Sequence, residues 1–582
     1  MKFYSTSEKN ALIVISLLKA HGIRFVIASP GTTNNALIGS IQKDPFFKIF
    51  SSVDERSAAY MACGLSAETG EPVVISCTGA TASRNYAPGM TEAYYRKLPV
   101  LAITSTQPVS RIGHHVAQVI DRSVISNDIA NLSVNLPVIK DEEDFWDCEI
   151  KVNQAILELT RRGGGPVHIN LPTTYSLPFT EKESIHCRVI NRFTLNNELP
   201  DLNQNKRISV IIGSHNTWSE EDTIALESFC DRYNAAVFCD HTSGYKGKNR
   251  VPISLAAAQE IHSKSELKSD ITLHIGEVTG DYPLLGMAAN EVWRISPDGE
   301  IRDTFRKLRY VFEMPETPFF QYYTEETSEP STNEFFEQCT NFLKTVQSKI
   351  PEVPFSNVWL ASKLASKIPA GSAIHFGILN SLRTWNFYDL PDTVTSFSNV
   401  GGFGIDGGVS SLLGASLANP EKLYYGVIGD LAFFYDLNAI GNRHIAKNLR
   451  ILLVNNGKGT EFRLYNHHAS HFGMDGDEFV AAAGHYGNKS STLIKNYAEN
   501  LGFEYFSANN KEEFENVYQR FLELSITEKP MIFEVFTDSE DESKALQIMH
   551  RLETNTEAKA KQTLKKVLGP KGIDVVKKMV KR

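Results

Sequence analysis

The chain of 582 residues contains no long hydrophobic run, whereas a helix that spans a bilayer needs about 20 consecutive apolar residues. Its seven cysteines are dispersed, odd in number and free of any Cys-X-X-Cys pair. This pattern argues against a zinc ribbon or a disulfide framework and for a reducing compartment. Residues 1–10 are polar and contain no apolar signal segment, so we expect a soluble, cytoplasmic protein.

Positive charge is scarce over most of the chain and concentrated at its end. The formal net charge is −9, yet ten basic and only three acidic residues occur from Arg551 onward. The body therefore lacks the basic surface of a nucleic-acid-binding protein, and no nucleic acid is expected as a partner. The tail has apolar and basic residues at helical spacing, which fits an anionic membrane, nucleic acid, an acidic partner surface or a solvated helix on the acidic body. We favour the solvated helix and leave the role of the tail open.

Short apolar runs recur along the whole chain, and each is followed by a stretch with helical spacing. This alternation predicts an α/β fold whose mostly parallel strands are buried on both faces. The length suggests roughly three or four domains, and the polar segments 195–206 and 315–333 have the composition of linkers. The predicted strands are 25–31, 72–80, 99–108, 166–172, 209–213, 235–241, 271–277, 292–299, 310–316, 373–377, 394–402, 423–430, 451–456 and 531–538. The predicted architecture is three consecutive domains, 1–190, 205–345 and 354–545, followed by a basic tail, 546–582.

Two pairs of polar residues stand at the ends of successive strands in the third domain. Gly429 and Asp430 end one apolar run, and Asn455 and Asn456 end the next, 25 residues later. In a parallel sheet, ligands bind in the crevice outside the carboxyl ends of the strands. A carboxylate and an amide oxygen there suit Mg²⁺, which also recruits phosphate oxygens. The alternative is structural, with Asp430 capping a helix and the asparagines forming a turn, but the occurrence of both pairs at this spacing favours the metal site.

A glycine-rich segment lies between a predicted strand and a predicted helix of the same domain. Residues 402–407, Gly-Phe-Gly-Ile-Asp-Gly, fit the Gly-X-Gly-X-X-Gly pattern of a dinucleotide site. A dinucleotide-dependent oxidoreductase is therefore a rival hypothesis. It would leave the metal-type residues downstream unexplained.

The Gly-Asp and Asn-Asn pairs, together with the domain order, resemble the thiamin diphosphate (ThDP) enzymes of the pyruvate decarboxylase and acetohydroxyacid synthase superfamily. The resemblance implies a pyrimidine-binding, a central and a diphosphate-binding domain, in that order. It implies Mg²⁺ bound by Asp430, Asn456 and the backbone carbonyl of Lys458, where the family usually has glycine. Ile405 matches the bulky residue that bends the cofactor, although it could be a core isoleucine. The other implied cofactor contacts are Ser381, Gly404, Gly429, Leu431 and Ala432.

Segment 52–95 resembles the pyrimidine-binding domain of that superfamily. There a glutamate just after a strand, here Glu55, hydrogen-bonds the pyrimidine and favours the tautomer whose nitrogen takes the proton from the thiazolium ring. Glu55 also begins a helical pattern over 55–69, where the helix dipole alone favours an acid. With Asp430 and Asn456 in place, we favour the catalytic role. Because these groups lie in different domains, the resemblance implies active sites between the subunits of a homodimer or homotetramer.

Three segments, 375–385, 398–407 and 429–440, are similar to the menaquinone-pathway synthases within the superfamily. Those enzymes hold carboxylate-rich substrates with several arginines, which recognise carboxylates through two parallel hydrogen bonds. Three of the arginine positions are occupied by other residues in this chain, although Arg383 lies close to one of them. The replacements are Thr33, Val400 and Trp385. We therefore expect a less cationic pocket that recognises such substrates more weakly.

Polar residues of the first and third domains complete the predicted pocket. Ser381 and Gln118 are expected to line it, and His114 and His115 precede Gln118. A histidine near the cofactor could shuttle protons, because its pKa lies close to neutrality, and His115 is the candidate we name as catalytic. Three further histidines follow the predicted metal loop and are interpreted as surface or lid residues: His467, His468 and His471.

We expect a ThDP- and Mg²⁺-dependent transferase or lyase that decarboxylates a 2-oxo acid, with pyruvate and 2-oxoglutarate the leading donors, and transfers the acyl unit to an acceptor. The alternatives are the menaquinone-pathway reaction itself, from 2-oxoglutarate and isochorismate, an acetolactate synthase-like reaction and the dinucleotide-dependent oxidoreductase. FAD is not expected, because no segment of the central domain can be assigned to it. A retired ThDP fold that acts through its tail would not be expected to keep Glu55, Asp430, Asn456 and Ile405.

Overall fold

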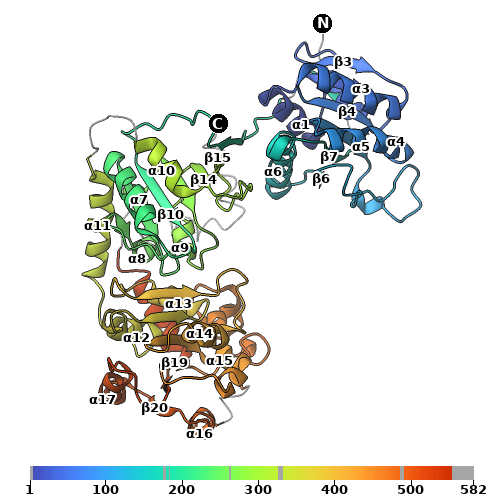
Figure 1. The fold of residues 1–582 in the computed structure, drawn as a ribbon. Helices are drawn as coiled ribbons and strands as arrows, with labels where there is room; N and C mark the ends of the chain where they lie inside the picture. Colours follow the sequence, from blue (N-terminus) through green and yellow to red (C-terminus); the bar gives the residue numbers. More distant parts are fainter. Residues whose placement is uncertain are drawn as a thin grey trace. The chain divides into compact units, whose positions relative to one another are not determined.

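The computed structural model describes residues 4–174, 178–181, 184–260, 264–324, 332–484 and 490–553. The chain divides into two compact units, which are described separately (Figure 1). Unit 1 comprises Met1–Asn197 and Asp298–Glu313, and unit 2 comprises Glu198–Pro297 and Met314–Arg582. Both contain mostly parallel sheets with helices between the strands, so the predicted α/β class is confirmed. None of the helices in the described ranges is long and apolar enough to span a membrane.

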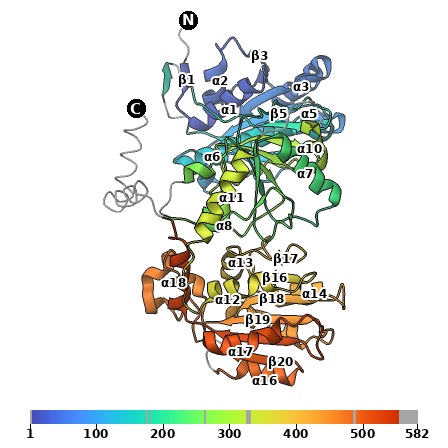
Figure 2. The same cartoon turned by 90° about the vertical axis from the view of Figure 1, so that its left-hand side faces the viewer.

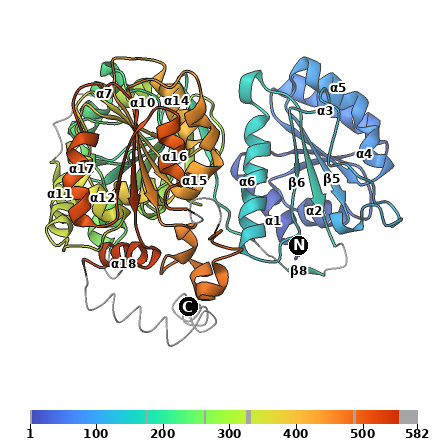
Figure 3. The same cartoon turned by 90° about the horizontal axis from the view of Figure 1, so that it is seen from below.

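Unit 1 is built around a six-stranded parallel sheet in the order β3-β2-β4-β5-β7-β6. Helices cover both faces, with α1, α2 and α6 on one side and α3 and α5 on the other (Figure 3). A short antiparallel pair, β1-β8, and a parallel pair, β15-β9, complete the unit. Its elements are β1 (Tyr4–Thr6), α1 (Lys9–Ala20), β2 (Phe25–Ala28), α2 (Asn35–Ile41), β3 (Lys48–Ser51), α3 (Glu55–Thr69), β4 (Val73–Thr78), α4 (Thr81–Asn85), α5 (Ala87–Arg96), β5 (Val100–Thr106), β6 (Leu132–Asn135), α6 (Glu142–Glu158), β7 (Val167–Pro172), β8 (Phe179–Glu181), β9 (Asn191–Thr194) and β15 (Leu308–Glu313).

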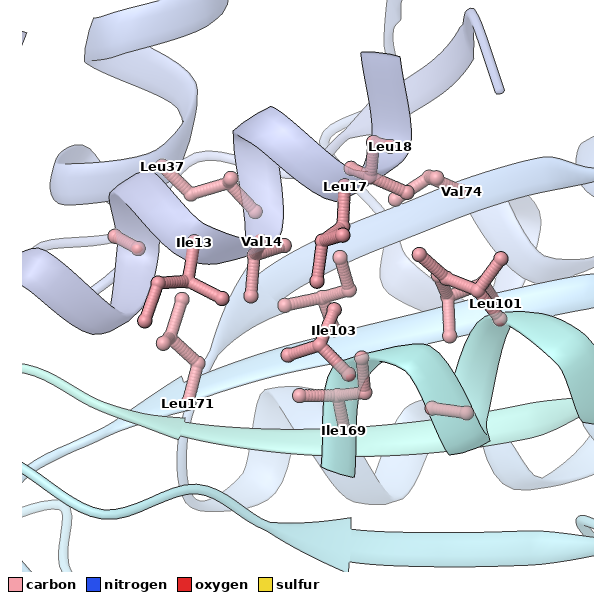
Figure 4. Close-up of a cluster of buried hydrophobic side chains, with 14 of the residues drawn as sticks. Ile13, Val14, Leu17, Leu18, Leu37, Val74, Leu101, Ile103, Ile169 and Leu171 are labelled. Carbon is pink, nitrogen blue, oxygen red and sulfur yellow. The ribbon is translucent and has the colours of Figure 1, made fainter. Parts of the chain in front are cut away.

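The core of unit 1 joins its first helix to the middle of the sheet. Ile13, Val14 and Leu17 of α1 recur at helical spacing and are fully buried. They face Ile103 of β5 and Ile169 of β7 (Figure 4). Full burial of such a side chain contributes about 1.5–3 kcal/mol to the stability of the folded state. This core fixes the strands whose carboxyl ends carry the predicted residues of the first domain.

Unit 2 contains two parallel sheets in the parts that the structure describes. One has the order β12-β11-β10-β13-β14, and the other β17-β16-β18-β19-β21-β20. Helix α14 packs on β18, and α16 and α17 pack beside β20 (Figure 2). The elements are β10 (Ile208–Ile212), α7 (Glu220–Arg232), β11 (Ala235–Cys239), β12 (Arg250–Val251), α8 (Ser254–Ala257), β13 (Ile271–Ile275), α9 (Tyr282–Leu285), β14 (Glu291–Ile295), α10 (Glu316–Thr324), α11 (Glu334–Gln347), α12 (Asn357–Leu364), β16 (Ala373–Phe376), α13 (Asn380–Trp385), β17 (Thr395–Ser398), α14 (Gly408–Ser416), β18 (Tyr424–Gly429), α15 (Asp430–Tyr435), β19 (Leu449–Asn455), α16 (Leu493–Asn500), β20 (Glu504–Ala508), α17 (Lys511–Phe521), β21 (Met531–Phe536) and α18 (Ser539–Met549).

The segment 315–333, predicted as a linker, is partly helical, so that prediction is wrong for its first half. Helix α10 begins at Glu316 and buries Phe319, Phe320 and Tyr323 as it packs against α7. The proline, threonine and glutamate content suggested a linker, but aromatic residues at helical spacing outweigh it. The other predicted linker, 195–206, contains no helix or strand.

The predicted tail, 546–582, begins inside a helix, so its first residues belong to the folded body. Helix α18 ends at Met549, and both Leu546 and Met549 are buried. The next residue, His550, accepts a hydrogen bond of 2.9 Å from the backbone N–H of Glu260. The rest of the basic tail, residues 554–582, lies outside the described residues. The boundaries of the three domains stay predictions.

Candidate functional site

The two polar pairs of the third domain lie at one edge of one sheet. Strands β18 and β19 are parallel neighbours, with Gly429 opposite Val454. Asp430 therefore follows the end of one strand, and Asn455 and Asn456 end the next. This is the arrangement that the sequence predicted from the topology of parallel sheets.

Asp430 is the first residue of α15 and is buried. One of its carboxylate oxygens, Oδ2, accepts a hydrogen bond of 3.0 Å from the backbone N–H of Gly457. Burial raises the pKa of Asp430 to about 7, while hydrogen bonds from the backbone N–H groups of Leu431, Gly457 and Asn456 act in the opposite direction. A cation beside this carboxylate would favour its ionised form.

The two asparagines play different parts. Asn455 donates a hydrogen bond of 2.6 Å to the buried carboxylate of Glu534, which also accepts one from Tyr505. Asn456 Oδ1, in contrast, is buried and has no hydrogen-bond partner among the described residues. Buried amide oxygens are normally paired, so an unpaired one beside Asp430 fits a hard metal ligand. The role of Asn456 as a metal ligand stays a prediction.

Lys458 follows this pair in the loop after β19. Its ammonium group forms an ion pair of 2.8 Å with Asp477, so its side chain is already engaged. The backbone carbonyl is the group that the sequence analysis named as a ligand. A site of this kind needs one carboxylate only, and within the described ranges no group of three or more His, Cys, Asp and Glu residues forms a metal cluster.

A cavity of about 240 Å³ opens beside Asp430 and Asn456. It collects most of the cofactor contacts predicted in the third domain, which come from four separate loops. Those that line it are Ser381, Ile405, Gly429, Asp430, Leu431, Ala432, Asn456 and Lys458. Gly404 does not line it, although its neighbour Ile405 does. The residue types fit a phosphate-bearing cofactor with a metal ion, because small residues leave backbone N–H groups accessible.

Several residues of this cavity were not predicted from the sequence, among them two acids and an asparagine. Glu461, Glu542 and Asn357 line it, and they come from distant parts of the chain. Glu542 is fully enclosed and accepts hydrogen bonds from the Asn357 backbone N–H and the Thr537 hydroxyl. Burial raises its pKa to about 7. No local pattern marks such residues, since their role depends on packing between segments.

The turn that carries Ser381 is strained. Leu379 precedes α13 with φ 70° and ψ −121°, in a region that favours glycine. Ser381 is buried two residues later. Strain of this kind persists where surrounding contacts hold the backbone, and here it positions the start of α13 at the cavity.

The Gly-Phe-Gly-Ile-Asp-Gly segment forms the loop between β17 and α14. Asn399 ties its two ends by donating a hydrogen bond of 3.2 Å to the Gly407 carbonyl. Within the loop Phe403, not a glycine, adopts a positive φ of 54°. Ile405 reaches the cavity that Asp430 lines. The segment therefore serves the same cavity as the metal-type residues and needs no separate dinucleotide site.

Glu55 lies in unit 1, at the start of α3. The preceding Asp54 caps this helix by accepting a hydrogen bond of 3.0 Å from Ser57. Asn85 approaches the Glu55 carboxylate at 3.4 Å, and part of the side chain is exposed. The glutamate thus stands at the carboxyl edge of the unit 1 sheet, as predicted, and remains accessible.

Gln118 and His115 lie in the segment that follows β5. Both are exposed and both have positive φ values, 62° and 54°. The backbone of Gln118 lies beside Gly79 at the end of β4, where an added Cβ would come within 3.5 Å of the Gln118 carbonyl oxygen. The structure thus places Gln118 at the sheet edge, whereas a catalytic role for His115 or His114 stays a prediction.

Of the later histidines, His467 has a role in local structure. His467 caps the 3₁₀ segment His468–Gly476 by accepting a hydrogen bond from the backbone N–H of Ala469, and its ring contacts Phe462 edge-on. Phe462 lines the cavity. His468 and His471 are exposed, which agrees with the surface interpretation.

The three positions without arginine are all buried. Thr33 hydrogen-bonds the Thr78 hydroxyl and the Ser105 carbonyl, at 2.5 and 2.9 Å. Val400 is 3% exposed. Trp385 is fully enclosed and donates to Asn357 at 3.1 Å. The side chains at these positions are therefore turned into the protein.

Comparison with known proteins places this geometry in a family. Residues 9–125 match the family described as thiamine pyrophosphate enzyme, N-terminal TPP binding domain. The chain is 32% identical to a protein of Bacteroides fragilis named 2-succinyl-5-enolpyruvyl-6-hydroxy-3-cyclohexene-1-carboxylate synthase, across 93% of this chain and 98% of the relative. Proteins with the same name from Bacteroides thetaiotaomicron and Phocaeicola vulgatus are each 30% identical, across 93% and 95% of this chain and 98% and 100% of their own. The protein is a ThDP-dependent enzyme and belongs to the thiamine pyrophosphate enzyme family that includes these synthases.

Proposed function

We propose that the protein is a Mg²⁺- and ThDP-dependent carboligase that decarboxylates a 2-oxo acid and transfers the remaining acyl unit to an acceptor. The observation that carries the proposal is the cavity beside Asp430, where the unpaired Asn456 Oδ1, Ser381 and Ile405 meet. When bound, ThDP supplies the electron sink that allows a 2-oxo acid to lose CO₂.

Each residue has a distinct task in this proposal. Asp430, Asn456 and the Lys458 carbonyl would hold Mg²⁺, which would neutralise the charge of the diphosphate. Ile405 lines the same cavity and would support the cofactor there. Glu55 would hydrogen-bond the pyrimidine and so favour its reactive tautomer. The protein works in the cytoplasm, a proposal supported by seven free and buried cysteines.

The names of the relatives favour one reaction. The protein would then combine 2-oxoglutarate with isochorismate, because the likeness to synthases extends over nearly the whole of both chains. A second candidate has a specific observation in its favour. Thr33, Val400 and Trp385 provide no cation at three positions where carboxylate-binding arginines were expected, so a smaller donor such as pyruvate with an uncharged acceptor is the alternative.

A donor screen tests the proposal. The purified protein is incubated with ThDP, Mg²⁺ and each of several 2-oxo acids, with and without isochorismate, while CO₂ release is followed. Release from 2-oxoglutarate with consumption of isochorismate would establish the first reaction. Release from pyruvate alone would establish the second. An absence of both ThDP uptake and CO₂ release would overturn the proposal, and Asp430→Asn is the inactive control.

A further inference from the structure

Arg122 is a buried cation for which the described residues provide no ion pair. Its side chain belongs to unit 1, and the residue is only 5% exposed. Nη2 lies 3.4 Å from the Thr104 carbonyl, the outer limit of a hydrogen bond, and Nη1 is buried with no partner. No carboxylate in the described residues forms an ion pair with it. Buried arginines are normally paired, because an isolated charge loses its hydration without compensation.

The unpaired guanidinium group lines a cavity of about 70 Å³. Ser83, Thr104 and Ser126 line the same space, together with the exposed Arg84 as a second cation. The Ser83 hydroxyl donates to the Ala80 carbonyl, and the Thr104 hydroxyl contacts His168 and Asn170. The apolar wall of the cavity is formed by Met90, Ile125 and Ile129. A buried guanidinium group without an ion-pair partner, with a second cation beside it and an apolar wall behind it, is an environment that suits a small anion.

The groups around Arg122 do not neutralise its positive charge. The buried His168 lies in the same cavity wall, and burial and the charge of Arg122 lower the pKa of that imidazole to about 3, so it stays neutral. Burial and Arg84 lower the pKa of Arg122 to about 10, while the Cys77 thiol opposes them. Arg122 therefore remains a cation at neutral pH. An anion would remove the cost of burying it.

We propose that this cavity is a binding site for one small oxyanion, a carboxylate or a phosphate group, held by the guanidinium fork of Arg122. This cavity is lined by residues of unit 1, whereas the cavity beside Asp430 is lined by residues of unit 2. The wall of the Arg122 cavity includes Ser83 and Tyr86, which flank Arg84 and Asn85 at the junction of α4 and α5, and Asn85 also contacts Glu55. A bound anion would reduce the mobility of the junction between α4 and α5. The inference does not depend on the proposed function.

Thermal unfolding of the full-length protein provides the test. Acetate and inorganic phosphate are titrated separately at constant ionic strength, with potassium HEPES as the reference salt because its anion is too bulky for the cavity. Binding to the folded state alone raises the melting temperature with the logarithm of the anion concentration, by a few degrees at about 100 times the dissociation constant. A shift with acetate alone identifies a carboxylate site, and one with phosphate alone a phosphate site.

Variants test whether the anion-induced rise in melting temperature requires Arg122. Arg122→Gln should abolish it and should raise the melting temperature in HEPES, because the unpaired charge is gone. Ser126→Phe leaves Arg122 in place but adds a bulky ring to the cavity lining, and should also abolish the shift. Arg96→Gln, which removes an exposed arginine of α5, is the control and should respond like the unmodified protein. A flat titration of the unmodified protein, or an equal shift in Arg122→Gln, would overturn the proposal.

Discussion

Arg383 forms an ion pair of 2.7 Å with Glu461, which lines the cavity beside Asp430. Arg383 also donates a hydrogen bond of 3.3 Å to the Gly280 carbonyl, and its guanidinium group lies 4.3 Å from the centre of the Tyr282 ring. The arginine that the sequence suggested as a substitute for lost substrate contacts therefore holds the cavity wall to the loop before α9. Its positive charge is paired with Glu461 within the protein.

Arg383→Met should destabilise the protein and weaken ThDP binding. The substitution leaves Glu461 half-buried and without its cation, which costs about 1–3 kcal/mol in the free energy of unfolding. Urea unfolding and ThDP titration measure the two effects. The matched control is Lys447→Met, which breaks an exposed ion pair with Glu528 and should cost at most about 0.5 kcal/mol. An additive effect of Arg383→Met and Glu461→Gln in the double variant would show that the pair is not coupled.

The adjacent asparagines should separate cofactor binding from stability. Asn456→Ala removes an oxygen that has no partner in the protein, so we expect little loss of stability without cofactor but a weakening of Mg²⁺ and ThDP binding by at least about tenfold. Asn455→Ala should instead lower the free energy of unfolding by about 1–3 kcal/mol and leave cofactor binding largely unchanged. The reason is that it removes the amide that hydrogen-bonds the buried Glu534. Calorimetric titration and urea unfolding of both variants provide the comparison. Equal changes in cofactor affinity and in the free energy of unfolding for the two variants would contradict the role of Asn456 as a metal ligand.

The sequence predicted the elements with continuous apolar character, and each predicted run contains a strand. It missed seven strands, β1, β3, β6, β8, β9, β12 and β20, which are edge strands or two-stranded pairs. They carry few fully buried residues, so their pattern is weak. In the site, the residues at strand ends were predictable because topology places them at one edge. Glu461 and Glu542 were not, since they reach the cavity through contacts between distant segments.

Arg122 shows a further limit of sequence-based prediction. Nothing in the local pattern distinguishes it from an exposed arginine, because its burial and its lack of a partner depend on the packing of the segment after β5. The same is true of Leu379, whose positive φ depends on the turn into α13. A residue type can be read from the sequence, whereas its solvation and backbone strain cannot.

Asp281 should make stability depend on pH. Burial raises its pKa to about 7, and the nearby Asp240 adds to this while Arg383 opposes it. In the unfolded chain the pKa of an aspartate is about 3.9. The protonated form is therefore favoured by folding, and this contribution is complete below about pH 4 and is lost as the pH rises through about 7. The free energy of unfolding should fall over that interval.

Asp281→Asn should flatten this part of the profile, because asparagine does not titrate but can still accept the hydrogen bond from Ser254. Urea unfolding at pH 5 and pH 8 measures the difference between the variant and the unmodified protein. Asp392→Asn, an exposed acid of the same unit, should leave the profile unchanged. A profile of Asp281→Asn as steep as that of the unmodified protein would rule out this residue as the cause.

Leu379→Gly should stabilise the protein in spite of the lost side chain. A non-glycine residue in this region of φ and ψ destabilises the folded state by about 1–3 kcal/mol, and glycine would remove this strain. Glycine also gives the unfolded chain more freedom, which lowers the free energy of unfolding by about 0.4–1 kcal/mol. We expect a net gain of about 1 kcal/mol in urea unfolding. Leu417→Gly, at an exposed leucine with φ −73°, should instead lose about 0.5–1 kcal/mol. A loss at both positions would show that Leu379 is not strained.

Glu55 and Asp430 lie in different units of the chain, and we expect each active site to take them from two subunits. Co-expression of Glu55→Gln with Asp430→Asn tests this arrangement. In a mixed dimer one site would then carry both substitutions and the other neither, so random assembly should restore about a quarter of the normal CO₂ release. Each variant alone should be inactive, and the two purified variants mixed without subunit exchange are the control. If both residues of a site came from one chain, every site in the mixed dimer would carry a substitution, and no activity would return.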